Sequence, residues 1–371
     1  MLKMWDLDKR GCELIFLIGF SVMLVFLIFA SGVEAAEEEL SLEAALDLLE
    51  EHSTSLQMAE LEFANARVEY DKAQAEYIRT ESRLQKLSAD LSLNRSRQQY
   101  RNNLLGIYLD FMNDYQNLQI QVQEVEAAEN EVEIDRARLS ETEEQVQAGH
   151  EPRIELLRQQ IQLNNAIFQL DEAEADRDKM VREMRRRLNL DQMPRLSSQL
   201  VGLEEMNIPE RDEAVEMALD HNFSVEIAEL SRELAEVELE RAQISGRPEL
   251  EILELENNLE LAELEAIEVR EDVEENVRDQ IHRVEQTERQ VELARDNLEQ
   301  AEEHLRITRE QREAGLVSAR ELDQAELEAT RAELEKQEAL TSHMVAYFQL
   351  QEMLGIDLEV IRDEIMAAFT R

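Results

Sequence analysis

The sequence has few of the residues that turns, strands and disulfides need. Its 371 residues include 9 glycines, 4 prolines and a single cysteine, and aromatic residues make up only 5% of the chain. So few glycines and prolines cannot supply the turns of a many-stranded β domain. With Cys12 alone the chain cannot form a disulfide framework, so helix packing has to hold the fold together.

Positive charge is scarce relative to negative charge. The chain has 39 Lys and Arg against 85 Asp and Glu, which gives a formal net charge of −46. Such acidity argues against nucleic acids and anionic lipid surfaces as partners. It leaves two interpretations, a solvated exterior of charged helices or an acidic lining or docking face of a channel.

What the chain does contain is typical of long helices. Charged residues make up 33%, and Ala, Glu, Leu and Arg dominate, as in coiled coils. We predict five long helices. Two of them run from about 98 to 147 and from about 249 to 313, and the other three end near residues 90, 188 and 353. On their surface, Arg306 is spaced to pair with Glu302 and Glu310 as solvated neighbours four residues away.

Apolar residues recur at every seventh position in two separate stretches. The positions are Phe111, Leu118, Val125, Val132 and Leu139, and then Val277, Val284, Val291, Leu298 and Leu305. This is the period of a coiled coil, in which each helix buries one narrow stripe against a neighbour. A helix over 249–313 would be about 100 Å long at about 1.5 Å per residue, which suits a spacer or a tunnel wall.

The N-terminus reads as a targeting segment. Lys3, Lys9 and Arg10 precede an apolar run over 14–30, and small residues around Ala35 form a cleavage pattern. We therefore assign 1–35 as a signal peptide, with an uncleaved membrane anchor as the alternative. Cys12 precedes the apolar run, so it is not placed for lipid attachment at the cleavage site.

Two tight turns organise the rest of the chain. At the second turn Gly315 ends one helix, and Ser318 with Glu321 forms a capping box that starts the next. At the first turn Gly149 aligns with Gly315, and Pro152 suits a helix start because its φ is preset. The candidate docking residues at these turns are Gly149, His150, Glu151, Pro152, Gly315, Leu316, Val317 and Ser318. Leu316 and Val317 either meet a partner or fold back onto the hairpin.

The two turns belong to an internal duplication. When their glycines are aligned, the two seven-residue stripes coincide position by position, which indicates pseudosymmetry. We divide the chain into a signal peptide and four further parts. The parts are a first hairpin repeat over 36–191, a connector over 192–209, a second hairpin repeat over 210–357 and a C-terminal tail over 358–371.

The duplicated motifs resemble the TolC-type outer-membrane efflux protein family. The matching motifs are L-S-L-E-A-A-L at 40–46, H-S-T-S-L at 52–56, H-N-F-S-V at 221–225, the two turns, R-L-N-L-D at 187–191 and M-L-G-I-D at 353–357. The resemblance covers most of the chain after the signal peptide. It implies a homotrimer whose hairpins form a tunnel, with turns that dock a periplasmic adaptor of an inner-membrane pump.

In that family each repeat also contributes strands to a membrane barrel, and here the chain departs from the pattern. The corresponding places, 87–94 and 247–254, show only brief alternation, and Glu251 and Glu254 would be costly facing lipid. The predicted fold class is therefore all-α, with duplicated long helical hairpins that form the wall of an α-barrel-type tunnel. The β-barrel segment is expected to be vestigial or absent.

The sequence carries no motif for catalysis or cofactor binding. Its six histidines are scattered without the spacing of zinc ligands. It has no glycine-rich phosphate loop, nucleophile elbow or calcium loop. Tyr347 and Phe348 in the last predicted helix fit packing better than a ligand site. We expect neither an enzyme nor a bound metal or cofactor.

The first functional hypothesis is a passive conduit of an efflux or type I secretion system. It would be located in the outer membrane or periplasm of a double-membraned bacterium. The second hypothesis is a coiled-coil scaffold of the cell envelope that transports nothing. An adaptor protein fits less well, because adaptors flank their hairpin with β-rich modules, and glycine and proline are too few here.

Overall fold

Long antiparallel helix pairs make up the fold. The computed structural model describes residues 39–197, 199–202 and 206–370, and the predicted signal peptide lies outside them. The first repeat forms helices α2 (Leu42–His52), α3 (Thr54–Thr80), α4 (Arg83–Gln147) and α5 (Arg153–Leu188). The second forms α6 (Arg211–His221), α7 (Phe223–Ile244), α8 (Glu249–Glu313) and α9 (Ala319–Met353). The all-α prediction and the duplication are thus confirmed.

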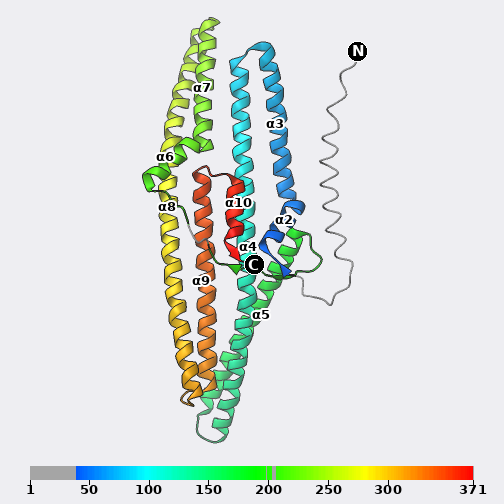
Figure 1. Ribbon diagram of the computed structural model, residues 1–371, viewed down its shortest axis with the longest axis vertical. Coiled ribbons are helices and arrows are strands. Elements are labelled where there is room, and N and C mark those ends of the chain that lie inside the picture. The colour runs from blue at the N-terminus through cyan, green and yellow to red at the C-terminus, as the bar shows by residue number, and fades with distance from the viewer. Residues whose placement is uncertain (1–38, 198, 203–205, 371) are drawn as a thin grey trace. The chain divides into compact units, whose positions relative to one another are not determined.

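The pairs are arranged in the same way in both repeats. α3 packs on α4 and α4 on α5, while α7 packs on α8 and α8 on α9. α4 also contacts α7 and α9, which joins the two repeats. Figure 1 shows the turn between α4 and α5 and the turn between α8 and α9 at the same end of these helices.

Local chemistry fixes where the helices begin. The Ser41 hydroxyl caps α2 by accepting from the Ala44 N–H at 3.2 Å, and Ser53 caps α3 by accepting from Leu56 at 3.3 Å. The break between the first two long helices lies at residues 81–82, earlier than the predicted break after residue 90. There Glu81 adopts a left-handed φ of 52°, and Ser82 caps α4. Because a left-handed glutamate is uncommon, this turn could not be predicted from the residues around it.

The places where strands would interrupt the two repeats are helical. Residues 87–94 lie inside α4, and α8 begins at Glu249 directly after Pro248. The strands that the described residues do form are two residues long: β1 (Glu39–Leu40), β2 (Arg195–Leu196), β3 (Gln199–Leu200) and β4 (Phe369–Thr370). They make two small sheets, β1 with β2 and β3 antiparallel to β4.

The C-terminal segment, assigned from the sequence as a tail, contains a helix and β4. The helix is α10 (Leu358–Ala367), and it contacts α4 and α9. Its Arg362 guanidinium donates to Glu50 at 2.7 Å and to Asp47 at 3.2 Å, both on α2. The Tyr108 hydroxyl donates to the same Glu50 at 2.8 Å, so α2, α4 and α10 share one polar network.

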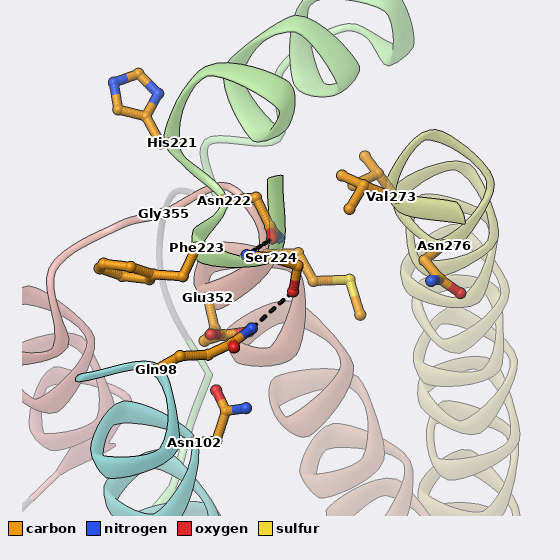
Figure 2. Close-up of a pocket in the computed structure, with 12 residues that line it drawn as sticks. Gln98, Asn102, His221, Asn222, Phe223, Ser224, Val273, Asn276, Glu352 and Gly355 are labelled. Carbon is orange, nitrogen blue, oxygen red and sulfur yellow. Dashed lines mark hydrogen bonds between the residues drawn. The ribbon is translucent and has the colours of Figure 1, made fainter. Parts of the chain in front are cut away.

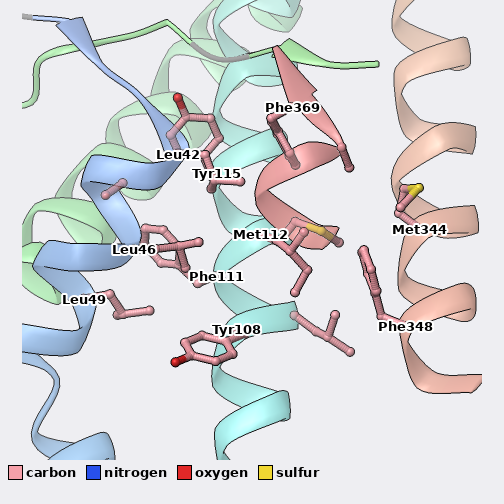
Figure 3. Close-up of a cluster of buried hydrophobic side chains, with 14 of the residues drawn as sticks. Leu42, Leu46, Leu49, Tyr108, Phe111, Met112, Tyr115, Met344, Phe348 and Phe369 are labelled. Carbon is pink, nitrogen blue, oxygen red and sulfur yellow. The ribbon is translucent and has the colours of Figure 1, made fainter. Parts of the chain in front are cut away.

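The main core lies where α2, α4, α9 and α10 meet (Figure 3). Phe111, Tyr115 and Phe348 are fully buried there, and the Tyr115 hydroxyl donates to the Leu40 carbonyl at 2.7 Å. Tyr347 and Phe348 are packing residues, as predicted. A second cluster joins α6, α8 and the end of α9.

The seven-residue stripes are confirmed as packing seams. Phe111, Leu118, Val125 and Val132 are buried on α4, and Val277, Val284 and Val291 are buried on α8. The last stripe residues before the turns, Leu139, Leu298 and Leu305, are only half-buried. Burial therefore decreases from the aromatic core toward the turns.

None of the helices within the described residues combines the length and the apolar character that crossing a membrane requires.

We predict that Phe348→Ala lowers the free energy of unfolding by about 3–5 kcal/mol, because it removes a fully buried ring and leaves a cavity. Urea denaturation followed by circular dichroism measures the change. The matched control is Leu250→Ala, whose side chain is 80% exposed and whose effect should stay within about 0.5 kcal/mol. Equal effects of the two substitutions would contradict this location of the core.

Candidate functional site

The first hairpin turn, residues 148–152, connects α4 to α5 through a left-handed glycine. Gly149 has a φ of 75°, a conformation that other residues adopt only with strain. The His150 N–H donates to the Gln145 carbonyl at 2.9 Å, and the Gly149 N–H donates to Val146 at 3.1 Å. This pair of bonds is a Schellman motif, which satisfies the last carbonyls of α4. Pro152 then begins α5 without a side-chain cap.

The second turn, residues 314–318, repeats this geometry and adds a better cap. Gly315 has a φ of 71°, and the Leu316 N–H donates to the Gln311 carbonyl at 2.8 Å. The Ser318 hydroxyl accepts from the Glu321 N–H at 3.2 Å, and the Glu321 carboxylate accepts from the Ser318 N–H at 2.7 Å. The predicted capping box is confirmed. The bonds that the Glu321 carboxylate accepts from the Ser318 N–H and hydroxyl lower the pKa of Glu321, because they favour its charged form.

Polar contacts bring the two turns together. Arg320, just after the second turn, pairs with Glu141 near the end of α4 at 3.3 Å. One turn of helix further on, Arg138 donates to the Gln324 side chain at 3.1 Å. Both links are exposed, so each adds little stability, but together they fix which faces of the two hairpins adjoin.

The side chains at the turns are mostly accessible to a partner. Leu316 is 77% exposed and does not fold back onto its hairpin. Val317 is half-buried, and its carbonyl accepts from Arg312 at 3.1 Å. Gly149, His150 and Pro152 are exposed, whereas Glu151 is half-buried. The turns therefore expose one large apolar side chain, Leu316, among polar side chains and backbone groups.

Groups that could hold a metal ion are not found at these turns. In the part of the chain that the structure describes, no cluster of three or more His, Cys, Asp or Glu side chains has the arrangement of a metal site.

A cavity that sequence reasoning missed lies where the two repeats meet (Figure 2). Its lining includes Gln98 and Asn102 of α4, the junction of α6 and α7, Asn276 of α8, and Glu352 at the end of α9. These residues are far apart in the chain, so no local motif marks them. The signal available in the sequence was Glu352, the one charged residue in the stretch 344–353 at the end of a helix.

Comparison with known proteins identifies the fold. No protein-family model and no curated protein sequence matches the chain. Solved structures do match, among them CusC, studied for transmembrane channel formation, with a TM-score of 0.60 and 12% identity over 89% of this chain and 96% of that one. The Campylobacter jejuni CmeC outer membrane channel matches with a TM-score of 0.60 and 13% identity over 88% of this chain and 89% of that one.

The open Neisseria gonorrhoeae MtrE outer membrane channel gives a TM-score of 0.58 and 14% identity over 88% of this chain and 94% of that one. The likeness extends over nearly the whole of each channel chain. The fold of this protein is therefore that of the TolC-type outer-membrane channels.

We predict that Ser318→Ala destabilises the start of α9 by about 0.5–2 kcal/mol, because it removes the hydroxyl that caps the helix. Hydrogen–deuterium exchange measures this as faster exchange at Glu321 and the following amides. Thr substituted at the same position keeps a hydroxyl and should preserve most of the protection. If Ser318→Ala and Ser318→Thr exchange alike, the capping box does not hold this turn.

Proposed function

We propose that the protein is a passive efflux or secretion conduit, built from several copies of the chain and docked through the turns at Gly149 and Gly315. The observation that carries this proposal is the fold, shared with outer membrane channels over almost the full length of those chains. Because identity is only 12–14%, the argument for assembly has to come from this chain's own residues.

The internal duplication indicates how copies would meet. Within one chain, α4 of the first repeat packs on α7 and α9 of the second. Arg331 donates to Glu131 at 2.6 Å, and close to this pair Ala127 and Leu334 are 6% and 7% exposed. When Gly149 is aligned with Gly315, each position in one repeat has an equivalent 166 residues away in the other. By this alignment α8 is the equivalent of α4, and α5 is the equivalent of α9.

The equivalent positions are apolar but exposed. Leu293 corresponds to Ala127 and is 61% exposed, and Phe168 corresponds to Leu334 and is 65% exposed. Nearer the turns, Ile154 on α5 and Ile307 on α8 stand in for Arg320 and Glu141, and both are exposed. These residues are apolar and exposed, whereas their equivalents in the internal interface are buried or paired. This is the pattern expected if the exposed faces form the same interface with another chain.

A second copy of this chain is therefore the natural occupant of both faces. The face on α8 of one copy meets the face on α3 and α5 of the next, which is a head-to-tail contact. Such contacts close into a ring when the rotation between copies permits it. The resemblance to the channel family implies three copies, so six hairpins would surround the axis.

The turns are the proposed adaptor-docking site in this assembly. Leu316 supplies an exposed apolar anchor, and His150, Glu151, Pro152 and Val317 form the polar and backbone surroundings. Burial decreases toward this end of the helices, so the turns can separate at less cost than the core. Docking of a periplasmic adaptor, itself attached to an inner-membrane pump, would use that lower cost to open the passage.

We predict that the double variant Leu293→Cys with Phe168→Cys, in a Cys12→Ser background, forms a ladder that stops at trimers on oxidation. The reason is that the head-to-tail contact brings Leu293 of one copy next to Phe168 of another. Non-reducing electrophoresis counts the linked copies. Each single-cysteine variant is the control, because one cysteine alone cannot link unlike faces in series.

Electron microscopy of the linked species then tests the conduit. A ring with an axial opening supports the proposal, whereas a closed bundle without an opening contradicts transport and leaves the envelope scaffold. No linkage, together with a monomer by light scattering both with and without detergent, would overturn the assembly altogether.

A further inference from the structure

The cavity between the repeats has a volume of about 190 Å³ and is open to solvent. Its floor and walls combine amide side chains, Gln98, Asn102 and Asn276, with the apolar side chains of Val273 and Val277. Figure 2 shows that the lining comes from four different parts of the fold, and that Gln98 donates to the Ser224 hydroxyl, at 2.6 Å. Ligand sites are usually hollows with apolar walls and a few convergent polar groups, and this cavity has both.

The duplication explains why the second repeat has this space. In the first repeat Arg187 lies over the Phe111 ring at 5.8 Å and also pairs with Asp114. The equivalent positions in the second repeat, 166 residues later, carry Met353 and Val277. A valine and a methionine fill less volume than a phenylalanine stacked with an arginine, and neither carries charge.

Two titratable side chains line the cavity, the carboxylate Glu352 and the imidazole His221, whose Nδ1 bonds to the Met217 carbonyl at 2.9 Å. Glu352 is half-buried in the last turn of α9, a turn that contains no basic residue. The partial negative charge at a helix C-terminus disfavours a carboxylate. Burial adds a second cost and raises the pKa of Glu352, and within the described part of the chain no hydrogen bond to its carboxylate opposes that shift.

The cation that acts most on Glu352 is Arg101, whose guanidinium is partly engaged elsewhere, while its Nε is buried without a hydrogen-bond partner among the described residues. Arg101 donates to the Ile356 carbonyl at 2.7 Å, and its guanidinium lies over the Phe223 ring at 5.4 Å. It lowers the pKa of Glu352 less than burial raises it. The carboxylate therefore faces the cavity with its charge only partly compensated.

We propose that this cavity binds a small organic cation, a primary ammonium group on a short aliphatic stem, with Glu352 as its counter-ion. The ammonium has three donors, which suit the carboxylate and the side-chain oxygens of Asn102 and Asn276. The stem lies against Val273, Val277 and Met353. A charge-assisted bond of this kind compensates the carboxylate at the point where the protein does not.

The size of the cavity limits the ligand. A volume of about 190 Å³ is well above the roughly 10–15 Å³ that a single water needs, and below the roughly 300 Å³ at which pockets for drug-sized ligands begin. The occupant is therefore a few heavy atoms long. The formal net charge of −46 also draws cations toward the chain and repels anions.

Isothermal titration calorimetry with n-butylammonium chloride tests the proposal on the full chain. We expect saturable binding at one site per chain, and affinity at least about tenfold lower for Glu352→Gln. The matched control is Glu359→Gln, which removes one exposed carboxylate a short distance along the chain and should bind like the wild type. The neutral isostere 1-butanol should give no saturable heat.

Two further measurements test the role of the cavity and of the Glu352 charge separately. Asn276→Leu places a larger apolar group at the exposed rim and should also weaken binding, without touching the buried carboxylate. In the absence of ligand, Glu352→Gln should raise the melting temperature relative to wild type, and the difference should grow as pH rises from about 4. The difference grows in this direction because the folded state raises the pKa of the Glu352 carboxyl. The wild-type protein therefore loses stability as rising pH ionises this group, and the glutamine variant does not.

Equal binding by Glu352→Gln and Glu359→Gln, or heat that does not saturate, would show only diffuse attraction to an acidic protein and would overturn the proposal. A melting temperature unchanged by Glu352→Gln at all pH values would overturn its premise. Because calorimetry does not depend on copy number or transport, these results stand apart from the outcome of the cross-linking experiment.

Discussion

The structure depends on one constraint, the burial of a narrow stripe along very long helices without disulfides to hold them. A seven-residue seam buries little area per turn, so the stability has to be concentrated where other elements add to it. That place is the level of Phe111 and Phe348, where α2 and α10 cover the long helices. Toward the turns the seam alone remains, and Leu139 and Leu305 are only half-buried. A rigid middle and looser ends follow directly from this distribution.

The duplication turns this constraint into a rule for assembly. Each repeat has two faces that a neighbouring hairpin can cover. Within the chain, α7 and α9 of the second repeat cover the face of the first repeat on α4. The other faces keep apolar residues such as Phe168 and Leu293 at positions whose equivalents are buried. A chain made of two similar halves thus carries one satisfied interface and the two halves of an unsatisfied one. In the proposed assembly, this pattern of exposure is an argument for a ring that is independent of the shared fold.

Much of this could be predicted from the sequence because its signals are local. Helix α8 begins and ends where the sequence placed it, and the Gly315 turn has the predicted cap. The break at Glu81 could not be predicted, because a glutamate rarely takes the left-handed conformation. Arg306 pairs with Glu310 as expected, but its second partner is Glu303 rather than Glu302, since either spacing suits a helix. The cavity depends on side chains from distant segments, which no local pattern reveals.

The cavity also shows how two similar repeats can differ in chemistry. If copies of the chain assemble head to tail, the equivalent boundary between two chains carries Leu264 and Glu268 in place of Gln98 and Asn102, and Phe111 and Arg187 in place of Val277 and Met353. At the position of Glu352 it has Arg186, which already pairs with Glu183. The Arg187 side chain over the Phe111 ring takes up the volume of the cavity there, so this boundary does not repeat the site even though it has the carboxylate of Glu268. A ring of these chains would therefore alternate between boundaries that bind a cation and boundaries that do not, with one binding boundary per chain rather than two.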